Sequence, residues 1–219
     1  MATKNTEVTE APKNDLAPAP VNSSFEIDPE DIDIPRINVT QKMSQSDSPV
    51  GSVVYDKTYA IAEPETPLDV IPVAAQKGWR EDIPFDDDDV PRIAWNKEQA
   101  DTIRNDSEYE MTEFAEITLL VKQPADCDEE AAEAFQIPLG DSNYALGKIN
   151  VAKNAYRSTF KRLATFAALN SGVPLSAKVW AFSSESITRG KYTWFTPNLV
   201  VTKNVPDAAA AEFVTKFAG

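Results

Sequence analysis

Segments rich in β-branched and aromatic residues recur along this chain of 219 residues without regular alternation with helices. They cover 52–59, 68–74, 114–121, 175–182 and 192–202, and their composition is typical of strands. Shorter helices are expected near 96–105, 128–135 and 206–217. A doubly wound parallel sheet needs strands and helices in turn, which this order lacks. The order therefore predicts an α+β protein with an antiparallel sheet or small barrel.

One helix is expected to be long, over 148–169. Its apolar residues recur at spacings of three and four and form a stripe typical of a helix that covers a sheet. They are Ile149, Ala152, Tyr156, Phe160, Leu163 and Ala167. Lys153, Arg157 and Lys161 recur every four residues, so they stack along another face. Like charges at this spacing disfavour a helix unless an anion meets them, which makes this face a candidate phosphate contact.

The two parts of the chain carry opposite charge. Residues 1–141 hold 32 Asp and Glu against 11 Lys and Arg, a net of −21. Residues 142–219 hold 3 acids against 10 bases, a net of +7. A basic module attracts phosphates, and an acidic arm beside it competes for the same surface. The alternative is that the two parts pack together and neutralise each other.

The N-terminal segment is expected to be a disordered acidic arm over 1–48. It is rich in proline, and Phe25 is its single aromatic residue. Such a segment cannot bury enough apolar area to offset a backbone entropy of about 1–2 kcal/mol per residue. A single α+β binding domain is then expected over 49–219. Within the arm, isoleucines alternate with acids and allow docking as an extended strand on a sheet edge. These isoleucines are Ile27, Ile32, Ile34 and Ile37.

Several classes of enzyme lack their residues in this chain. There is no histidine, which removes His-based triads, His general bases and His metal ligands. The single cysteine, Cys127, forms neither an internal disulfide nor a Cys-only zinc site. The seven glycines form no phosphate-binding glycine motif. The carboxylates of Asp86–Asp89 are consecutive and cannot converge on one ion from a strand or helix. We therefore expect a binding protein without enzymatic activity, cofactor or metal.

Aromatic and basic residues interleave near the C-terminus. In 175–184, Lys178, Trp180 and Phe182 share one face of an expected strand, opposite a face suited to the core. Proteins that bind single strands combine a basic groove for phosphates with rings on which bases stack. The alternative is that Trp180 and Trp194 form a second core layer beneath the helix. The candidate nucleic-acid-binding residues are Lys153, Arg157, Lys161, Lys178, Trp180, Phe182, Arg189, Lys191, Tyr192 and Trp194.

Three segments resemble known proteins: 34–44 (IPRINVTQKMS), 155–169 (AYRSTFKRLATFAAL) and 190–197 (GKYTWFTP). They look like a group of small tailed-bacteriophage proteins associated with replication and recombination, and the resemblance spans most of 30–217. More loosely, the chain is similar to phage single-stranded DNA-binding proteins built on OB-type barrels. This resemblance implies an OB-like antiparallel barrel or sheet with one long covering helix. Many such proteins carry an acidic C-terminal tail, whereas this chain carries its acids at the front.

The expected function is sequence-tolerant binding of single-stranded DNA in phage replication or recombination. The alternative is a structural or interaction protein, such as a virion component or host-factor inhibitor, whose acidic arm wraps a protein partner. The expected partners are single-stranded DNA and, through the acidic arm, phage replication proteins. The chain shows neither an apolar signal segment nor an apolar run of about 18 residues, so we expect no membrane contact and a cytoplasmic location.

Overall fold

The computed structural model of the chain describes residues 33–44, 47–84 and 86–218. By its contacts the chain divides into two units, 1–33 and 34–219, and the second unit contains the helices and strands described below. Most of the acidic arm expected over 1–48, including Ile27 and Ile32, lies outside the described residues.

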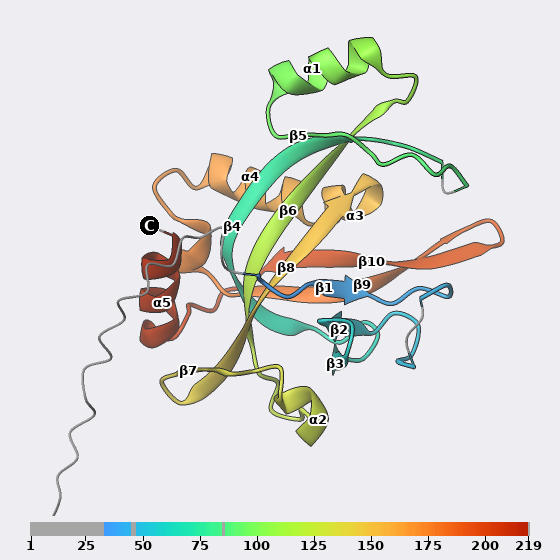
Figure 1. Cartoon of the computed structure of the whole chain (residues 1–219). Coiled ribbons are helices and arrows are strands. Elements are labelled where there is room, and N and C mark those ends of the chain that lie inside the picture. The colour runs from blue at the N-terminus through green and yellow to red at the C-terminus, as the bar shows by residue number, and fades with distance from the viewer. Residues whose placement is uncertain (1–32, 45–46, 85, 219) are drawn as a thin grey trace, which may run out of the picture. The chain divides into compact units, whose positions relative to one another are not determined.

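The main sheet is antiparallel and strongly curled, so that it forms a half-barrel (Figure 1). Its strands lie in the order β10-β9-β4-β6-β8-β7, and β5 pairs with β4. The strands are β4 (Leu68–Glu81), β5 (Ile93–Ala94), β6 (Met111–Lys122), β7 (Ile137–Leu139), β8 (Ser142–Ala152), β9 (Trp180–Arg189) and β10 (Tyr192–Val201). The expected α+β class with an antiparallel sheet is confirmed.

A smaller antiparallel sheet, in the order β1-β2-β3, continues the curl. It consists of β1 (Ile37–Val39), β2 (Val53–Tyr55) and β3 (Tyr59–Ala62). A parallel bridge between Arg36 and Lys148 joins it to β8. On the far side, Gly51 lies against the Phe195 ring of β10 with φ of +97°, and a Cβ there would come within 2.6 Å of the ring. The two sheets therefore approach each other at β10 as well as at β8.

The folded unit begins earlier than the expected boundary at residue 49. Ile37 in β1 is 1% exposed and packs so closely on Gly147 of β8 that a Cβ there would lie 2.7 Å from its side chain. Ile34 packs against a second core cluster. Of the four isoleucines expected to dock as an extended strand, Ile37 lies in β1 and Ile34 packs on the core just before it, whereas Ile27 and Ile32 lie outside the described residues.

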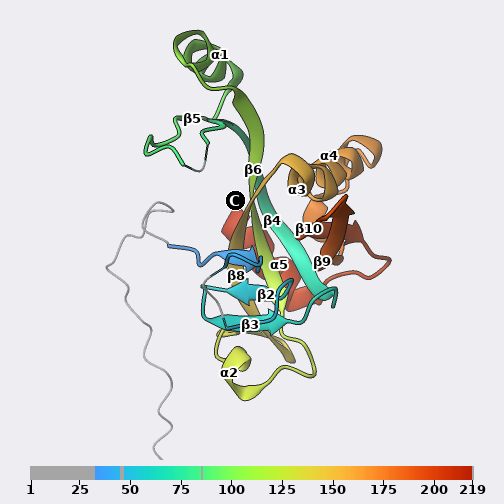
Figure 2. The ribbon, with the colours of Figure 1, turned by 90° about the vertical axis from the view of Figure 1, so that its right-hand side faces the viewer.

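The helices are short. They are α1 (Lys97–Asp106), α2 (Glu129–Ala132), α3 (Lys153–Ser158), α4 (Phe160–Leu169) and α5 (Ala208–Ala218), with a 3-10 turn at Leu175–Ala177. Figure 2 shows α3 and α4 on the same side of β4 and β6 as β9 and β10, and α1 beyond one end of those strands. In the described part of the chain, no helix has the length and hydropathy needed to cross a membrane.

The prediction of one long helix over 148–169 is wrong in two respects. Residues 148–152 complete β8, where Ile149 and Val151 are buried and Asn150 is exposed, the alternation of a strand. The helical part begins at Lys153 and is divided at Thr159, whose φ and ψ are −123° and −82°. Ile149 and Ala152 fit the helical period of the following residues as well, so the apolar stripe extended the predicted helix too far.

The core lies on both faces of the central strands. Leu119 and Leu120 are neighbours in β6 and point to opposite faces. Leu119 belongs to the main cluster inside the half-barrel, which α3 and α4 cover through Tyr156 and Leu163. Leu120 belongs to the smaller cluster, which α5 covers.

Candidate nucleic-acid interface

An open groove of about 590 Å³ lies between α3 and the β9–β10 hairpin. It is lined by Ala152, Lys153, Asn154, Ala155, Arg189, Tyr192, Trp194, Phe195, Thr196 and Pro197. The groove brings together four residues that the sequence nominated: Lys153, Arg189, Tyr192 and Trp194. Two of these are cations and two are aromatic.

The hairpin side chains that line the groove follow the two-residue alternation of a strand. Tyr192 pairs opposite Arg189, and Trp194 follows two residues later, so all three side chains lie on one face of the ribbon. Gly190, with φ of +62°, permits the tight turn between the strands. Next to it, the Lys191 ammonium lies 5.3 Å from the centre of the Tyr192 ring.

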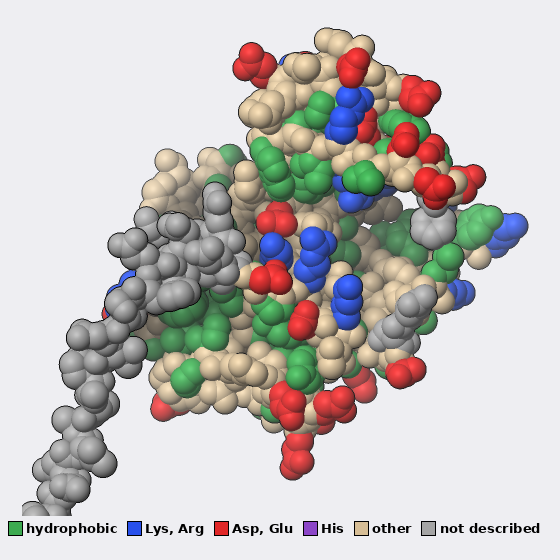
Figure 3. Space-filling model, viewed as in Figure 1, with side chains coloured by type: hydrophobic (Ala, Val, Ile, Leu, Met, Phe, Trp, Pro, Cys, Tyr) green, Lys and Arg blue, Asp and Glu red, His purple; other side chains and the backbone are tan. Residues whose placement is uncertain are grey.

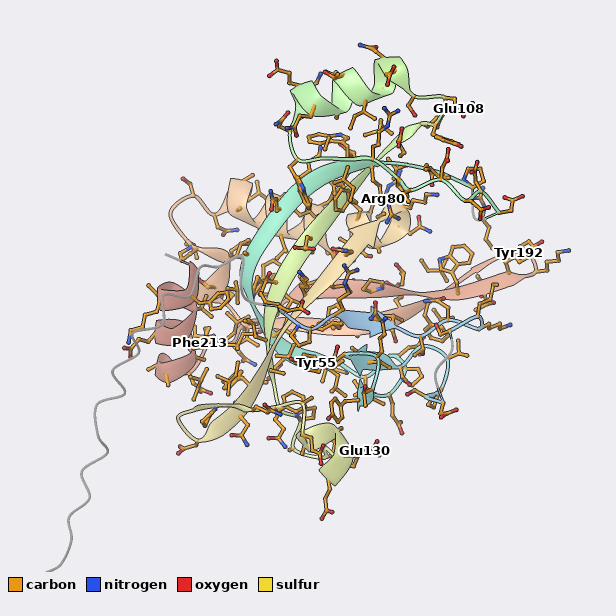
Figure 4. All side chains as sticks on the ribbon, viewed as in Figure 1. Tyr55, Arg80, Glu108, Glu130, Tyr192 and Phe213 are labelled. Atoms are coloured by element: carbon orange, nitrogen blue, oxygen red, sulfur yellow. The ribbon has the colours of Figure 1, made fainter. Side chains whose placement is uncertain are left out.

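The hairpin extends beyond the rest of the sheet, and Tyr192 lies near its free end (Figure 4). The Tyr192 side chain is 65% exposed, and that of Trp194 is half-buried. Figure 3 shows Lys and Arg side chains at this end of the hairpin, and Asp and Glu side chains over α1, over α2 and on the loop between β4 and β5, just above the hairpin end in this view. The Tyr192 ring thus lies beside two cations of the hairpin, Arg189 and Lys191.

The opposite wall begins with Lys153, whose backbone is left-handed with φ of +53°. This conformation costs a non-glycine residue about 1–3 kcal/mol and lets β8 pass directly into α3. The Lys153 ammonium pairs with the Asp82 carboxylate at 2.8 Å, and both side chains are partly exposed. Arg157, one helical turn further along α3, is exposed and has no ion-pair partner among the described residues.

Six nominated residues lie outside the groove lining: Lys191 at the hairpin end, the core residues Trp180 and Phe182, and the three bases Arg157, Lys161 and Lys178. Arg157 follows Lys153 on α3, but the break at Thr159 puts Lys161 on a different helix. The Lys161 ammonium instead lies 5.9 Å from the centre of the Tyr156 ring. Lys178 precedes β9 and is half-buried. The continuous basic helix face expected from the spacing is therefore interrupted.

Trp180 and Phe182 do not offer exposed rings, and the expectation that they stack bases is corrected. Both side chains are 1% exposed in the main core cluster. The Trp180 indole donates a hydrogen bond to the Leu175 carbonyl at 3.2 Å, and its ring meets Phe166 edge to face at 5.3 Å. Because β9 pairs with both β4 and β10, its wide apolar side chains fill the space that the curled sheet encloses. The alternative interpretation, a core layer beneath the helix, holds for Trp180.

Sequence reasoning missed Asp82 as a partner of the basic helix. Asp82 follows β4, which ends at Glu81, and the Asp82 amide donates a hydrogen bond to the Glu110 carbonyl at 2.8 Å. Its ion pair with Lys153 joins residues 71 positions apart in the chain, and no local sequence motif indicates such a contact.

The neighbouring Glu81 fixes this end of β4. Its side chain is 3% exposed and accepts hydrogen bonds from the Arg92 guanidinium at 2.8 and 2.9 Å and from the Ser107 hydroxyl. The Arg92 hydrogen bonds lower the pKa of Glu81 to about 2. Arg92 also pairs with Asp106 at the end of α1. This network anchors β5 and α1 to β4 and sets the position of Asp82.

The Cys127 thiol is not activated as a nucleophile. Burial, together with Asp128 and Asp126, raises the pKa of this thiol, which disfavours the thiolate. Within the described ranges, no group of three or more Cys, Asp or Glu side chains is placed to hold a metal ion.

Comparisons with models of known protein families, with curated proteins and with solved structures found no match to the chain.

Proposed function

We propose that this chain binds single-stranded DNA without sequence preference, in the groove between α3 and the β9–β10 hairpin. The observation that carries the proposal is the joining of Lys153 and Arg189 with the accessible rings of Tyr192 and Trp194 in one groove. Cations pair with phosphates, and every base offers a face that stacks on an aromatic ring. This combination binds a strand whatever its sequence.

The size of the groove fits part of a strand. A volume of about 590 Å³ accommodates about one or two nucleotides, since pockets of roughly 300–1,000 Å³ hold small organic ligands. The strand continues past Lys191 at the hairpin end and past Arg157 on α3, which extend the line of positive charge. Contacts of this kind make affinity depend strongly on salt.

The curled antiparallel half-barrel and the resemblance of 34–44, 155–169 and 190–197 to phage replication and recombination proteins support the same class. We assign the chain to OB-like single-strand binders that act on phage DNA during replication or recombination. The acidic N-terminal segment is its contact for partner proteins in that process.

The test is a titration of labelled oligo-dT over a series of salt concentrations. Arg189→Gln with Lys191→Gln removes one cation that lines the groove and one beside it at the hairpin end. This double variant is expected to weaken binding and to reduce the salt slope by about 1.4, or about 0.7 per phosphate contact. The matched control, Lys57→Asn with Lys203→Gln, removes two exposed cations elsewhere; asparagine suits Lys57 because its φ is +61°. Equal salt slopes for the two double variants, or no binding at low salt, would contradict the proposal.

A further inference from the structure

The Asp82–Lys153 ion pair occupies the rim of the proposed groove. Asp82 contacts the ammonium with both carboxylate oxygens, at 2.8 and 2.9 Å. Lys153 is at the same time a lining residue of the groove. A phosphate that uses this cation must therefore compete with a carboxylate that is already in place.

The backbone positions of both Lys153 and Asp82 are fixed by the fold. Lys153 stands at the direct junction of β8 and α3 with φ of +53°, so no flexible loop carries it. Asp82 directly follows Glu81, which is fixed by Arg92 and Ser107, and its own amide is bonded to Glu110. The pair is thus preformed in the resting protein.

The pair is nevertheless open to exchange. The side chains of Lys153 and Asp82 are 63% and 41% exposed, and exposed ion pairs of this kind are weak. A strand that is held at the same time by Arg189, Tyr192 and Trp194 presents its phosphate at high local concentration. One anion can then replace the other at Lys153 without unfolding of either wall.

From this geometry we infer that Asp82 is a built-in competitor for the phosphate that Lys153 binds, and that it sets the affinity and salt dependence of single-strand binding. The inference rests on the proposed function and names a residue that tunes it. In the resting protein Asp82 neutralises Lys153, so phosphate binding at this point releases little net counterion. Removal of the Asp82 charge makes Lys153 a full phosphate contact and also removes repulsion between carboxylate and phosphate.

The experiment measures the affinity and salt slope of oligo-dT binding by Asp82→Asn. The expected result is binding about three- to tenfold tighter at low salt, with a salt slope larger by about 0.7. Asp101→Asn is the matched control, because Asp101 is also ion-paired and partly exposed but lies on α1 with Lys97 and Arg104. It is expected to bind like the wild type. The double variant Asp82→Asn with Lys153→Gln is expected to lose the gain, and thermal unfolding confirms that each variant is folded.

The outcomes separate the two claims. If Asp82→Asn binds like Asp101→Asn while Arg189→Gln with Lys191→Gln weakens binding, the competitor role is wrong and the proposed function stands. If the double variant keeps the tighter binding, the gain does not pass through Lys153 and the inference is again overturned. If neither the wild type nor any variant binds at low salt, both claims fail.

Discussion

The side-chain amide of Gln41 binds the main chain of Phe195 with both of its polar atoms. Its Nε2 donates to the Phe195 carbonyl at 2.8 Å, and its Oε1 accepts from the Phe195 amide at 3.2 Å. A neighbouring strand would offer the same donor and acceptor. Further along β10, the Ser158 hydroxyl donates to the Pro197 carbonyl and Arg162 donates to the Leu199 carbonyl. Side chains thus cover an edge strand that would otherwise pair with other chains.

The Gln41 contact also holds a wall of the groove, since Phe195 lines it. Gln41→Ala leaves one donor and one acceptor of Phe195 without their partners, and is expected to lower the free energy of unfolding by about 1–3 kcal/mol. Urea unfolding measures this loss. Gln76→Ala is the control, because the Gln76 side chain is exposed on β4 and makes no hydrogen bond within the described residues. Equal stability of the two variants would show that the Gln41 bonds contribute nothing.

Truncation of Trp180 in β9 is expected to lower mainly stability, and truncation of Trp194 in β10 is expected to lower mainly the affinity for single strands. Trp180→Ala empties part of the main core and should cost about 3–5 kcal/mol of stability. Trp194→Ala should cost less stability and should weaken single-strand binding by about 1–3 kcal/mol, the value of one stacked base. Chemical unfolding and oligo-dT affinity on the same preparations separate the effects. A Trp194→Ala variant that unfolds early and binds normally would assign that ring to the core alone.

Glu81 is expected to make stability sensitive to acid. Its pKa is lowered from 4.5 to about 2 in the folded chain, so the unfolded chain takes up a proton first as the pH falls. The stability that Glu81 contributes is complete above pH 4.5 and is lost as the pH falls from there towards 2. Urea unfolding can be measured at neutral pH and at a pH between these two values. The free energy of unfolding should fall less between the two conditions for Glu81→Gln than for the wild type. Glu63→Gln is the control at an exposed carboxyl, and its free energy of unfolding should fall as much as that of the wild type.

Tyr144 is expected to hold α5 on the sheet. Its buried hydroxyl donates to the Asp207 carboxylate at 3.0 Å, directly before α5, and this bond lowers the pKa of Asp207. Tyr144→Phe keeps the ring in the second core cluster but removes the bond, and should lower stability by about 1 kcal/mol. Amide hydrogen exchange should rise in α5 and remain unchanged in α1. A uniform change in both helices would mean that the bond does not hold α5 in particular.

Local patterns predicted most elements of this fold because β-branched runs and capping residues act over short distances. Asn96, for example, accepts a hydrogen bond from the Gln99 amide and begins α1 where the sequence suggested a helix. The face of β9 was assigned wrongly because both faces carry apolar residues, and local alternation does not say which face the curled sheet encloses. Burial of Trp180 and Phe182 follows from the pairing of β9 with β4, which is a long-range contact.

The candidate site was predictable only in part for the same reason. The bases and rings of 189–194 lie in one hairpin, so their clustering follows from strand alternation. Lys153 faces them because β8 ends at the groove, and Asp82 reaches Lys153 from another strand altogether. Neither of these long-range contacts can be predicted from the spacing of residues within one segment of the sequence.

The central claim is that single-stranded DNA lies in the groove between α3 and the β9–β10 hairpin. Photo-crosslinking of oligo-dT containing 5-iododeoxyuridine, followed by mass spectrometry of the peptides, tests it most directly. Adducts are expected on Tyr192 or Trp194, and they should disappear with excess unlabelled strand. Trp95, which is 42% exposed and precedes α1, serves as the internal control ring and should stay unmodified. Specific adducts on Trp95, with Tyr192 and Trp194 unmodified, would contradict the claim.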